Sequence, residues 1–455
     1  MDKIRIQVPA YVNEILNAIH VGGHEAYIVG GCVRDALLGR TPGDYDITTS
    51  ARPEEIQALF KRTVPTGIKH GTVTVLAGKE KCEVTTYRID GKYADGRHPE
   101  SVTFTASLEE DLKRRDFTIN AFAWSEEEGL IDYFNGLEDL KNKIVRAVGE
   151  PTERFSEDAL RILRAFRFSA QLGFEIELST LQAAKELAGT LEKISAERIH
   201  DELIKLISSD HPEKMLDLYE AGITSVILPE FDALMHTPQQ NPWHCYDAGT
   251  HSIKSMCAVR NDPVLRLTML LHDIAKSVTR HRDDKGIDHF YGHPAKGAVM
   301  AEKILRRLKC DNKTIRRVTA FIRYHDFHVG TSPDAVRIRM VMHMLGREDF
   351  PLLLEVVDAD NAAKAPDKTA GKEKEQERML AMYHQVLESG DPIDLQDLAV
   401  TGADLLEHGI PEGRMIGILL EAMMQDVLTT PAHNTKEYLL AEGTLEMYLH
   451  YREDA

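Results

Sequence analysis

The spacing of the apolar residues changes once along the chain, near Gly149-Glu150-Pro151, and this change limits the fold to an α/β segment followed by helices. Before it, short apolar runs such as 26–31 (AYIVGG) and 44–49 (DYDITT) are typical of strands and alternate with short helical stretches. After it, apolar residues recur at helical spacing to the end of the chain. We therefore expect an α/β head, a helical neck, a helical body and a helical tail, over residues 1–150, 151–240, 241–370 and 371–455.

The composition of the chain argues against several classes of protein. The formal net charge of −18 argues against a protein that coats nucleic acid nonspecifically, because phosphate binding depends on Lys and Arg. The five cysteines are scattered and form no C-x-x-C pair, which argues against a disulfide framework and a cysteine-based zinc site. The N-terminus has no apolar run typical of a secretory signal, and no segment approaches the length of a membrane span. We therefore expect a cytoplasmic protein without a membrane partner.

The segment 29–50 (VGGCVRDALLGRTPGDYDITTS) combines a Gly-Gly turn with two aspartates one residue apart. Side chains alternate along a strand, so Asp44 and Asp46 are expected to share a face and to bind Mg²⁺ together with substrate phosphates. The turn at Gly30-Gly31 leaves backbone N–H groups free to approach a triphosphate, and Arg34 adds a cation. This combination favours nucleotidyl transfer, although such a turn can also simply end a strand.

Two further elements supply candidates for the same site. The runs 71–78 and 81–89 predict a hairpin that turns at Gly78-Lys79, and Glu83 on it is a candidate third carboxylate. The segment 88–107, rich in Gly, Asp and Lys, predicts a surface loop. Downstream, Arg115 and Asp116 in KRRDFTINA open an apolar segment, an arrangement that often merely marks the start of a helix.

The stretch 157–167 (EDALRILRAFR) predicts a helix with Asp158, Arg161 and Arg164 along one side, opposite an apolar stripe. An acceptor beside a guanidinium donor matches the hydrogen-bonding edges of cytosine and adenine and opposes those of uracil and guanine. The ordinary alternative is an exposed ion pair three residues apart, worth a few tenths of a kcal/mol. The paired aspartates upstream favour base recognition.

Five successive segments resemble the motifs of the class II transfer-RNA nucleotidyltransferase family, which includes CCA-adding enzymes and bacterial poly(A) polymerases. They are GGCVRDALLGRTPGDYDI, RRDFTINA, DYFNGLEDLKNKIVRAVG, EDALRILRAFRF and ERIHDELIKL, and they span nearly half the chain. The resemblance implies a polymerase-β-like head, a neck that recognises the incoming base, and a body and tail that hold the tRNA acceptor stem. Its implied metal ligands are Asp44 and Asp46. Its implied nucleotide-binding residues are Gly30, Gly31, Arg34, Arg115, Asp116, Asp158, Arg161, Arg164 and Arg167.

A second set of residues, all after position 240, is typical of metal-dependent phosphoester hydrolysis. An adjacent His-Asp pair on a helix, completed by a distant His and Asp, can bind one or two transition metals and activate water. The set resembles the HD phosphohydrolase family, which implies a site for Mn²⁺, Ni²⁺, Co²⁺ or Fe²⁺. The implied ligands are His251, His272, Asp273 and Asp360, with His293 and His325 placed around a second metal or the phosphate.

Our leading hypothesis is a template-independent enzyme that adds or repairs the 3′-terminal CCA of tRNA from CTP and ATP by a two-metal mechanism. An enzyme of the same family that adds only the terminal A, or poly(A), is a close alternative, although the retained glycine-rich loop after Arg88 is unlike members that add only CC. A metal-dependent HD phosphohydrolase with an RNA-binding head is a different class. A noncatalytic RNA-binding protein would need neither set of metal ligands.

Overall fold

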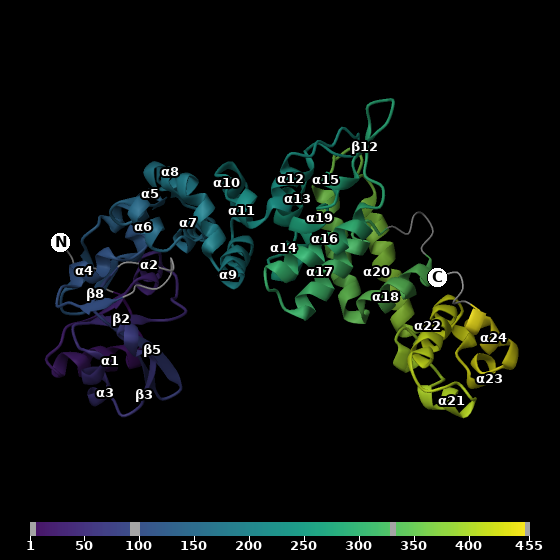
Figure 1. Ribbon diagram of the computed structural model, residues 1–455, viewed down its shortest axis with the longest axis horizontal. Helices are drawn as coiled ribbons and strands as arrows, with labels where there is room; N and C mark the ends of the chain where they lie inside the picture. Colours follow the sequence, from purple (N-terminus) through teal and green to yellow (C-terminus); the bar gives the residue numbers. More distant parts are fainter. Residues whose placement is uncertain (1–5, 92–100, 328–333, 451–455) are drawn as a thin grey trace. The chain divides into compact units, whose positions relative to one another are not determined.

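The computed structural model describes residues 6–91, 101–327 and 334–450, and it divides the chain into two compact units, Met1–Pro229 and Glu230–Ala455 (Figure 1). The first unit holds a mixed sheet and helices, and the second is almost entirely helical. The α/β head and the helical remainder predicted from the sequence are therefore both present. The domain boundaries expected near 150, 240 and 370 stay predictions.

The first unit is built around a seven-stranded sheet in the order β3-β4-β5-β2-β1-β8-β9. Strand β2 runs antiparallel to β1 and parallel to β5, so the predicted hairpin lies beside the strand that carries the aspartate motif. The hairpin turns at Gly78-Lys79 as expected, with Gly78 at φ +67°. The strands are β1 Ala26–Val29, β2 Asp46–Thr49, β3 Thr63–Gly67, β4 Thr72–Ala77, β5 Glu80–Thr86, β8 Phe122–Ser125 and β9 Gly129–Asp132.

Both faces of the sheet are covered at β1, because successive residues of this strand enter different cores. Ala26 and Ile28 of β1 pack in one apolar cluster with helices α1 (Ala10–Val21) and α3 (Pro53–Leu59). Tyr27 and Val29 point the other way, into a second cluster that includes α4 (Leu108–Lys113). A rigid, covered sheet fixes the ends of β1 and β2, where the aspartate motif lies.

The loop predicted after Arg88 begins and ends as a short antiparallel pair, β6 (Arg88–Asp90) and β7 (Val102–Phe104). Residues 92–100 of this loop lie outside the described residues. Two more short strands, β10 (Ile144–Val145) and β11 (Glu175–Ile176), run parallel. The remaining helices of this unit are α2 Gly31–Leu37, α5 Gly136–Asn142, α6 Pro151–Glu157, α7 Leu160–Leu172, α8 Leu178–Leu187, α9 Ala196–Ile207, α10 Met215–Glu220 and α11 Thr224–Ile227.

The neck sequence forms two helices, which corrects the single helix expected over 157–167. Helix α6 ends at Glu157, Asp158 has extended backbone angles, and α7 starts at Leu160. The Asp158 carboxylate accepts a hydrogen bond from the backbone N–H of Leu160, the first residue of the second helix. Helix α7 ends at Leu172, and the C-cap that follows, Gly173, has a φ of +69°, which suits glycine.

Aspartate caps begin several helices of the second unit that position its histidines. Asp247, Asp262 and Asp311 each accept backbone N–H groups at the starts of α13, α14 and α17. The main helices are α12 Pro229–Met235, α13 Ala248–Ala258, α14 Pro263–Leu271, α15 Lys276–Thr279, α16 His293–Arg307, α17 Asn312–Tyr324, α18 Ala335–Leu345, α19 Phe350–Ala362 and α20 Lys372–Glu388. A two-stranded ribbon, β12 (His281–Arg282) and β13 (Asp288–His289), stands between α15 and α16.

The C-terminal helices have an apolar core of their own. Leu405, Leu419 and Met423 are fully buried in it, together with residues of the last helices. These helices are α21 Gly402–Glu407, α22 Arg414–Thr429, α23 Lys436–Leu439 and α24 Glu442–His450. Within the described ranges, no helix has both the length and the apolar character needed to cross a membrane.

Candidate active sites

The paired aspartates of the head lie where β2 begins, but only one of them is in the strand. Strand β2 starts at Asp46, and Asp44 lies in the connection before it, which corrects the expectation that both are on the strand. The alternation continues nevertheless, since Asp44 and Asp46 are exposed and Tyr45 between them is buried. Both carboxylates therefore lie on the same solvent-exposed side of the chain, at the start of β2.

Glu83 lies beside Asp46 because β2 and β5 pair in parallel with these two residues in register. Three carboxylates thus lie close together beside the start of β2. Although Asp46 keeps contact with solvent, desolvation raises its pKa to about 6. The Arg115 guanidinium opposes this rise in pKa, and the neighbouring carboxylates increase it. A site that resists carboxylate ionisation in this way fits a cation such as Mg²⁺, whose charge would favour the ionised form.

The Gly-Gly turn connects β1 to α2 next to these carboxylates. Gly30 has a φ of +82°, and a Cβ added there would lie 3.0 Å from Nη1 of Arg115, so glycine allows this arginine to approach. Arg34, one turn into α2, donates to Oδ1 of Asn120 at 2.5 Å and to Asp35 at 2.8–2.9 Å. The turn therefore brings the Arg115 guanidinium close enough to act on Asp46, and Arg34 lies on the helix that follows the turn.

Asp116 connects the head to the neck. Its carboxylate accepts from Nε and Nη2 of Arg164 on α7 at 2.8 and 2.6 Å, and from the amide of Asn120 at 3.1 Å. Burial opposes ionisation, but Arg164 outweighs it and holds the pKa of Asp116 well below its usual range. The Arg34, Arg164 and Arg167 guanidinium groups all lie within 5.4 Å of the ring centre of Phe168. Asp116 is thus already paired within the unit.

The proposed base-reading residues have other partners here. Asp158 accepts from Arg198 of α9 at 2.8 and 3.3 Å, not from Arg161. Arg161 pairs with Glu157 at 2.5 Å and donates to the backbone oxygen of Arg114 at 2.9 Å. The expected row of three residues on one helix face is therefore corrected, because Asp158 precedes the helix. Both side chains nevertheless belong to the junction of α6 and α7.

Arg167 is 7% exposed and donates to Glu202, which is 5% exposed, and to Oε1 of Gln171 at 2.7 Å. Its role in nucleotide binding stays a prediction, because the structure shows a buried ion pair between α7 and α9.

We expect Arg167→Met to lower the free energy of unfolding by about 3 kcal/mol, because it leaves the buried Glu202 carboxylate without its counter-ion. Urea unfolding followed by circular dichroism measures the change. The double variant Arg167→Met/Glu202→Gln should recover most of the loss, since it removes the orphaned charge. Unchanged stability together with a weakened affinity for CTP would instead support a direct contact with nucleotide.

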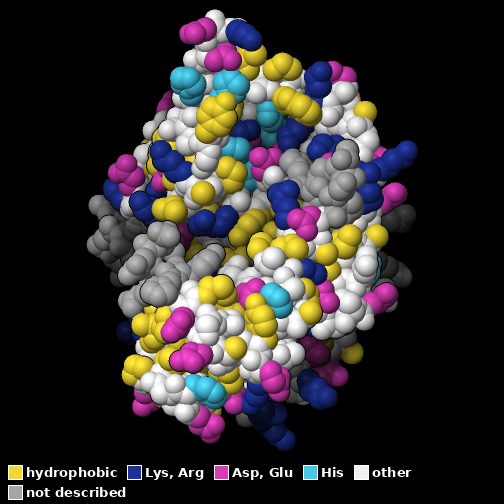
Figure 2. Space-filling model, turned by 90° about the vertical axis from the view of Figure 1, so that its right-hand side faces the viewer, with side chains coloured by type: hydrophobic (Ala, Val, Ile, Leu, Met, Phe, Trp, Pro, Cys, Tyr) yellow, Lys and Arg dark blue, Asp and Glu magenta, His cyan; other side chains and the backbone are white. Residues whose placement is uncertain are grey.

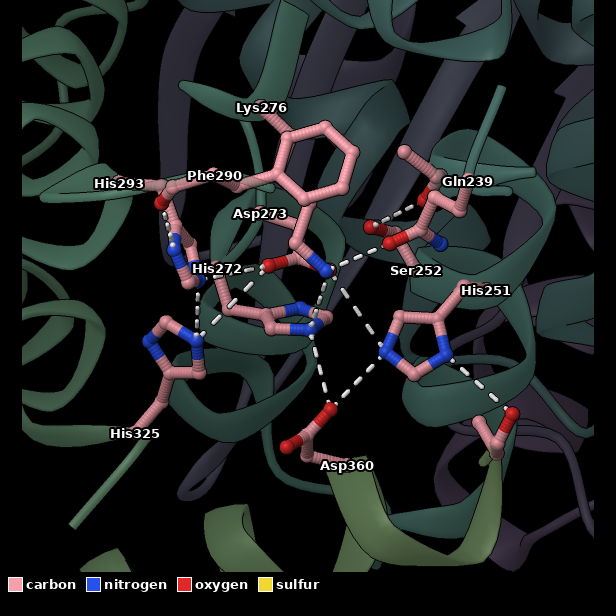
Figure 3. Close-up of polar contacts among 12 residues, drawn as sticks. Gln239, His251, Ser252, His272, Asp273, Lys276, Phe290, His293, His325 and Asp360 are labelled. Carbon is pink, nitrogen blue, oxygen red and sulfur yellow. Dashed lines mark hydrogen bonds and ion pairs between the residues drawn. The ribbon is translucent and has the colours of Figure 1, made fainter. Parts of the chain in front are cut away.

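The second candidate site lies in the helical unit, where five elements bring the predicted ligands together (Figure 3). His251 is on α13, Asp360 is on α19, and His293 begins α16. His272 and Asp273 follow the last residue of α14, and His325 follows α17, so the His-Asp pair is at a helix end and not within a helix as expected. Five of these six side chains are buried, and His293 is half-buried. Every residue predicted for this site is present in it.

The four imidazoles share one hydrogen-bonding pattern. In each, Nδ1 contacts a backbone oxygen: Ala363 at 3.2 Å, Met269 at 2.7 Å, Phe290 at 2.8 Å or Ile322 at 2.7 Å, for His251, His272, His293 and His325 respectively. A carbonyl only accepts, so Nδ1 carries the proton in the neutral ring and Nε2 keeps its lone pair. Each Nε2 lies within 3.8 Å of an Asp273 or Asp360 carboxylate oxygen.

The ligand atoms form two overlapping groups. His251, His272 and Asp360 offer atoms within 4.8 Å of one another, and so do His272, Asp273 and His325. Nε2 of His293 is 3.3 Å from Oδ1 of Asp273 and 3.2 Å from Nε2 of His325. Nε2 of His272 is buried and makes no hydrogen bond with any residue in the described part of the chain. Its nearest acceptors are carboxylate oxygens of Asp273 at 3.3 Å and Asp360 at 3.6 Å, and this donor set of imidazole and carboxylate fits one or two transition-metal ions.

Two lysines that the sequence reasoning missed contact the carboxylates of this site. Nζ of Lys276 is 2.6 Å from Asp273, and Nζ of Lys364 is 2.5 Å from Asp360. Burial opposes ionisation of Asp273, but His272 and Lys276 outweigh it and hold the pKa of the carboxyl well below its usual range. His244, also missed, lies 4.9 Å from the His251 ring, and burial lowers its pKa to about 3. The spacing Asp-x-x-Lys in 273–276 and Asp-x-x-x-Lys in 360–364 could have signalled the two ion pairs.

Three family models match the chain. One described as "Poly A polymerase head domain" matches residues 26–146, one described as "Probable RNA and SrmB- binding site of polymerase A" matches 173–235, and one described as "tRNA nucleotidyltransferase domain 2 putative" matches 295–442. The first covers the sheet with its carboxylates. The third covers His325 and Asp360 but begins after His293.

The named relatives described below are CCA-adding enzymes. The CCA-adding enzyme of Lactiplantibacillus plantarum is 36% identical over 442 residues, which is 96% of this chain and 97% of that protein. The CCA-adding enzyme of Streptococcus suis is 55% identical over 202 residues, so that match spans 44% of this chain and about half (50%) of the relative. The crystal structure of the Bacillus stearothermophilus CCA-adding enzyme in complex with CTP is 30% identical, with a TM-score of 0.68 over 98% of this chain and 99% of that one.

Proposed function

The chain belongs to the family of CCA-adding enzymes, and from this premise we propose that it adds or repairs the 3′-terminal CCA of tRNA using CTP and ATP. The observation that carries the proposal is the cluster of Asp44, Asp46 and Glu83 beside the Gly30 turn. Addition of only the terminal A, or of poly(A), has less support, because the relatives described above are named CCA-adding enzymes.

In this proposal the head residues bind and orient the triphosphate. The carboxylates of Asp44, Asp46 and Glu83 would hold Mg²⁺, which when bound polarises the phosphate and steadies the pyrophosphate leaving group. Arg34 and Arg115 flank the turn and would neutralise phosphate charge. Asp116 would act as a positioning residue, because it holds Arg164 and thereby fixes α7 against the head. The tRNA acceptor stem and 3′ end are the proposed macromolecular partner.

The direct test uses three tRNA transcripts, ending at the discriminator base, at C and at CC. CTP and ATP are supplied separately and together. A CCA-adding enzyme extends the first two with CTP and completes the third with ATP alone. Extension of only the third transcript would identify the A-adding alternative, and unlimited addition of A would identify the poly(A) alternative.

We expect Asp158→Ala to reduce the preference for CTP over UTP by about 5- to 150-fold. Uracil presents a carbonyl where cytosine presents an amino group, so the Asp158 carboxylate would face acceptor against acceptor. One such buried mismatch costs about 1 to 3 kcal/mol, and about 1.4 kcal/mol corresponds to a factor of ten. Single-turnover incorporation of each of the four nucleotides into tRNA lacking CCA measures the preference.

Two further variants make this experiment specific. Arg161→Ala should have a comparable effect, because it removes the donor half of the same pattern. Asp201→Ala, an exposed carboxylate on α9, should leave the CTP preference unchanged. If Asp158→Ala and Arg161→Ala both keep the normal preference, the two residues serve only as the ion pairs seen with Arg198 and Glu157.

A second activity is supported by a specific observation, the four imidazoles whose Nε2 atoms face Asp273 and Asp360. We propose that this site binds one or two transition metals and hydrolyses phosphoesters, with 2′,3′-cyclic or terminal phosphates as substrates. When bound, the metals would supply an activated water. Backbone oxygens fix the tautomers of the four imidazoles. Lys276 lies beside the carboxylate of Asp273, and Lys364 lies beside that of Asp360.

A further inference from the structure

Asp111, on helix α4, carries a charge that is fully enclosed by the head. Charged side chains normally lie at the surface, and Figure 2 shows basic and acidic groups interspersed over one face of the molecule. Asp111 is instead 0% exposed. Burial opposes ionisation of its carboxyl, but Arg114 and Arg115 outweigh burial and hold the pKa of this group below its usual range. A buried carboxylate that stays ionised depends on partners fixed around it.

The partners of Asp111 come from three segments of the head. Its Oδ1 atom accepts from the Arg114 guanidinium at 2.8 and 2.9 Å and from the backbone N–H of Arg88 at 3.3 Å. Its Oδ2 atom accepts from Oγ1 of Thr48 at 2.9 Å, and Nη2 of Arg115 lies 3.9 Å from the same oxygen. The carboxylate therefore links β2, the start of β6 and the residues that follow α4.

Strand β2 connects this carboxylate to those proposed to hold Mg²⁺. Side chains two residues apart on a strand share a face, so Thr48 lies on the same face as Asp46. Thr48 is 0% exposed, whereas Asp46 is exposed at the start of the strand. The hydrogen bond between Thr48 and Asp111 therefore holds β2 only two residues from a proposed metal ligand.

The Arg115 guanidinium lies near both Asp111 and the start of β2. Its Nη1 atom is 3.0 Å from the position that a Cβ on Gly30 would take, and Gly30 follows Val29, the residue of β1 that pairs with Asp46. Within the described part of the chain, Arg115 forms an ion pair with Asp111 and none with Asp46. Its charge nevertheless acts on Asp46, because it opposes the rise in the pKa of that carboxyl. Two carboxylates therefore compete for one guanidinium.

The charge of Asp111 decides this competition. Asp111 is the carboxylate that acts most strongly on Arg115, and Asp46 and Asp116 follow it. Asp116 is already paired with Arg164 at 2.6 Å. Without the charge of Asp111, Asp46 is therefore the partner that attracts the guanidinium. An arginine that pairs with Asp46 covers a metal ligand and repels a divalent cation.

We propose that Asp111 is a positioning residue that holds Arg115 away from Asp46, so that Asp46 stays open to Mg²⁺ and Arg115 to the phosphates of the nucleotide. This role rests on the nucleotidyl transfer proposed above for the head, but it concerns metal binding and can be tested without turnover. Asp111 contacts neither the metal nor the substrate, and it acts through Arg115 and, by its hydrogen bond to Thr48, through β2.

Electron paramagnetic resonance of Mn²⁺, a paramagnetic substitute for Mg²⁺, measures metal binding directly. The full chain is titrated, and binding at the head is defined as the component that Asp46→Asn removes. We expect Asp111→Asn to weaken the Kd of this component about tenfold, which corresponds to about 1.4 kcal/mol. Glu109→Gln, which changes an exposed carboxylate on the same helix, should leave the Kd unchanged.

A double-mutant cycle separates this role from a purely structural one. Arg115→Met removes the competing guanidinium, so in this background Asp111→Asn should cause no further change in the Kd for Mn²⁺. Equal weakening with and without Arg115 would overturn the proposal, because Asp111 would then act through the packing of α4.

Arg114→Gln tests the proposal in the opposite direction, and it does so even if thermal unfolding shows that Asp111→Asn does not fold. This variant leaves Arg115 as the guanidinium partner of the Asp111 carboxylate. Arg115 should then be held at least as firmly, so the Kd for Mn²⁺ should be unchanged or tighter. Weaker binding of Mn²⁺ by Arg114→Gln would contradict the proposed role.

Two results distinguish this proposal from the function on which it rests. If Asp46→Asn removes no Mn²⁺ binding, the metal assignment of the head is wrong, and the role of Asp111 is rejected with it. If Asp46→Asn removes binding and Asp111→Asn keeps the normal Kd, the metal site stands and only the role of Asp111 is rejected. In CMP addition, Asp111→Asn should need about tenfold more Mg²⁺ for half of its maximal rate, with an unchanged KM for tRNA.

Discussion

Asp46→Asn is expected to abolish nucleotide addition, lowering kcat by about 10³-fold or more, and Asp44→Asn should do the same. Each change removes a charge that would hold Mg²⁺ and keeps the side-chain volume. A bound metal supplies several kcal/mol of charge stabilisation, and each 1.4 kcal/mol is about a factor of ten in rate. Because both residues lie at the exposed edge of the sheet, the fold and tRNA binding should be largely unaffected.

The experiment compares single-turnover addition of CMP by each variant at saturating Mg²⁺, with tRNA affinity and thermal unfolding measured in parallel. Glu80→Gln, an exposed carboxylate at the start of β5, is the matched control and should retain normal turnover. Glu83→Gln tests the third carboxylate on the same strand and should reduce kcat strongly. Normal turnover in Asp44→Asn or Asp46→Asn would show that the metal assignment is wrong.

The local structure of the head could be predicted from the sequence, but the proximity of its strands could not. The Gly-Gly turn, the short helix after it and the hairpin at Gly78 depend on local patterns, and they are present. Strand β2 is separated from β5 by about thirty residues, and no local pattern specifies that the two pair in parallel. The position of Glu83 opposite Asp46 is a consequence of that long-range pairing, so the sequence suggested the residue but not its place.

The neck shows where a regular pattern misled the interpretation. Residues 157–167 contain no Gly or Pro, so helical spacing predicts one helix. The helical run is interrupted at Asp158, whose side chain accepts the backbone N–H of Leu160 and pairs with Arg198. Aspartate is a common capping residue, which was the one local signal for the break. The partner, forty residues away on α9, could not be read from the sequence.

The six residues of the histidine site were expected together because they resemble the HD phosphohydrolase family, and the structure brings them together, while their role as metal ligands stays a prediction. The charged groups that surround these residues were not predicted. Lys276 and Lys364 follow their aspartates at helical spacing, and Trp243 and Tyr291, which line the cavity of about 500 Å³ at this site, belong to irregular segments whose folding depends on the whole unit. A motif thus suggests the chemistry, whereas the other side chains that line the cavity are brought to it by tertiary contacts.

Asp273→Asn and His272→Ala are expected to remove the metal-dependent phosphohydrolase activity, by about 10³-fold or more, and to leave CCA addition unchanged. Asp273 approaches all four imidazoles, those of His251, His272, His293 and His325, at 3.6, 3.3, 3.3 and 3.8 Å, so its charge is shared by both groups of ligands. Loss of that charge removes the metal ions that would supply the activated water. The head carboxylates belong to the other unit, so these substitutions leave them unchanged.

Three measurements on the same preparations test this expectation: metal content by mass spectrometry, hydrolysis of 2′,3′-cyclic AMP with added Mn²⁺, Co²⁺ or Ni²⁺, and CMP addition to tRNA. His281→Ala, an exposed histidine of β12 outside the ligand groups, is the matched control and should keep all three. Thermal unfolding of each variant separates loss of metal from loss of fold, since Asp273→Asn retains the shape of the buried side chain. If the unmodified protein binds no transition metal and hydrolyses no phosphoester, the four converging imidazoles are a structural feature of the body and the second activity is rejected, while the carboxylates of the head keep their proposed role.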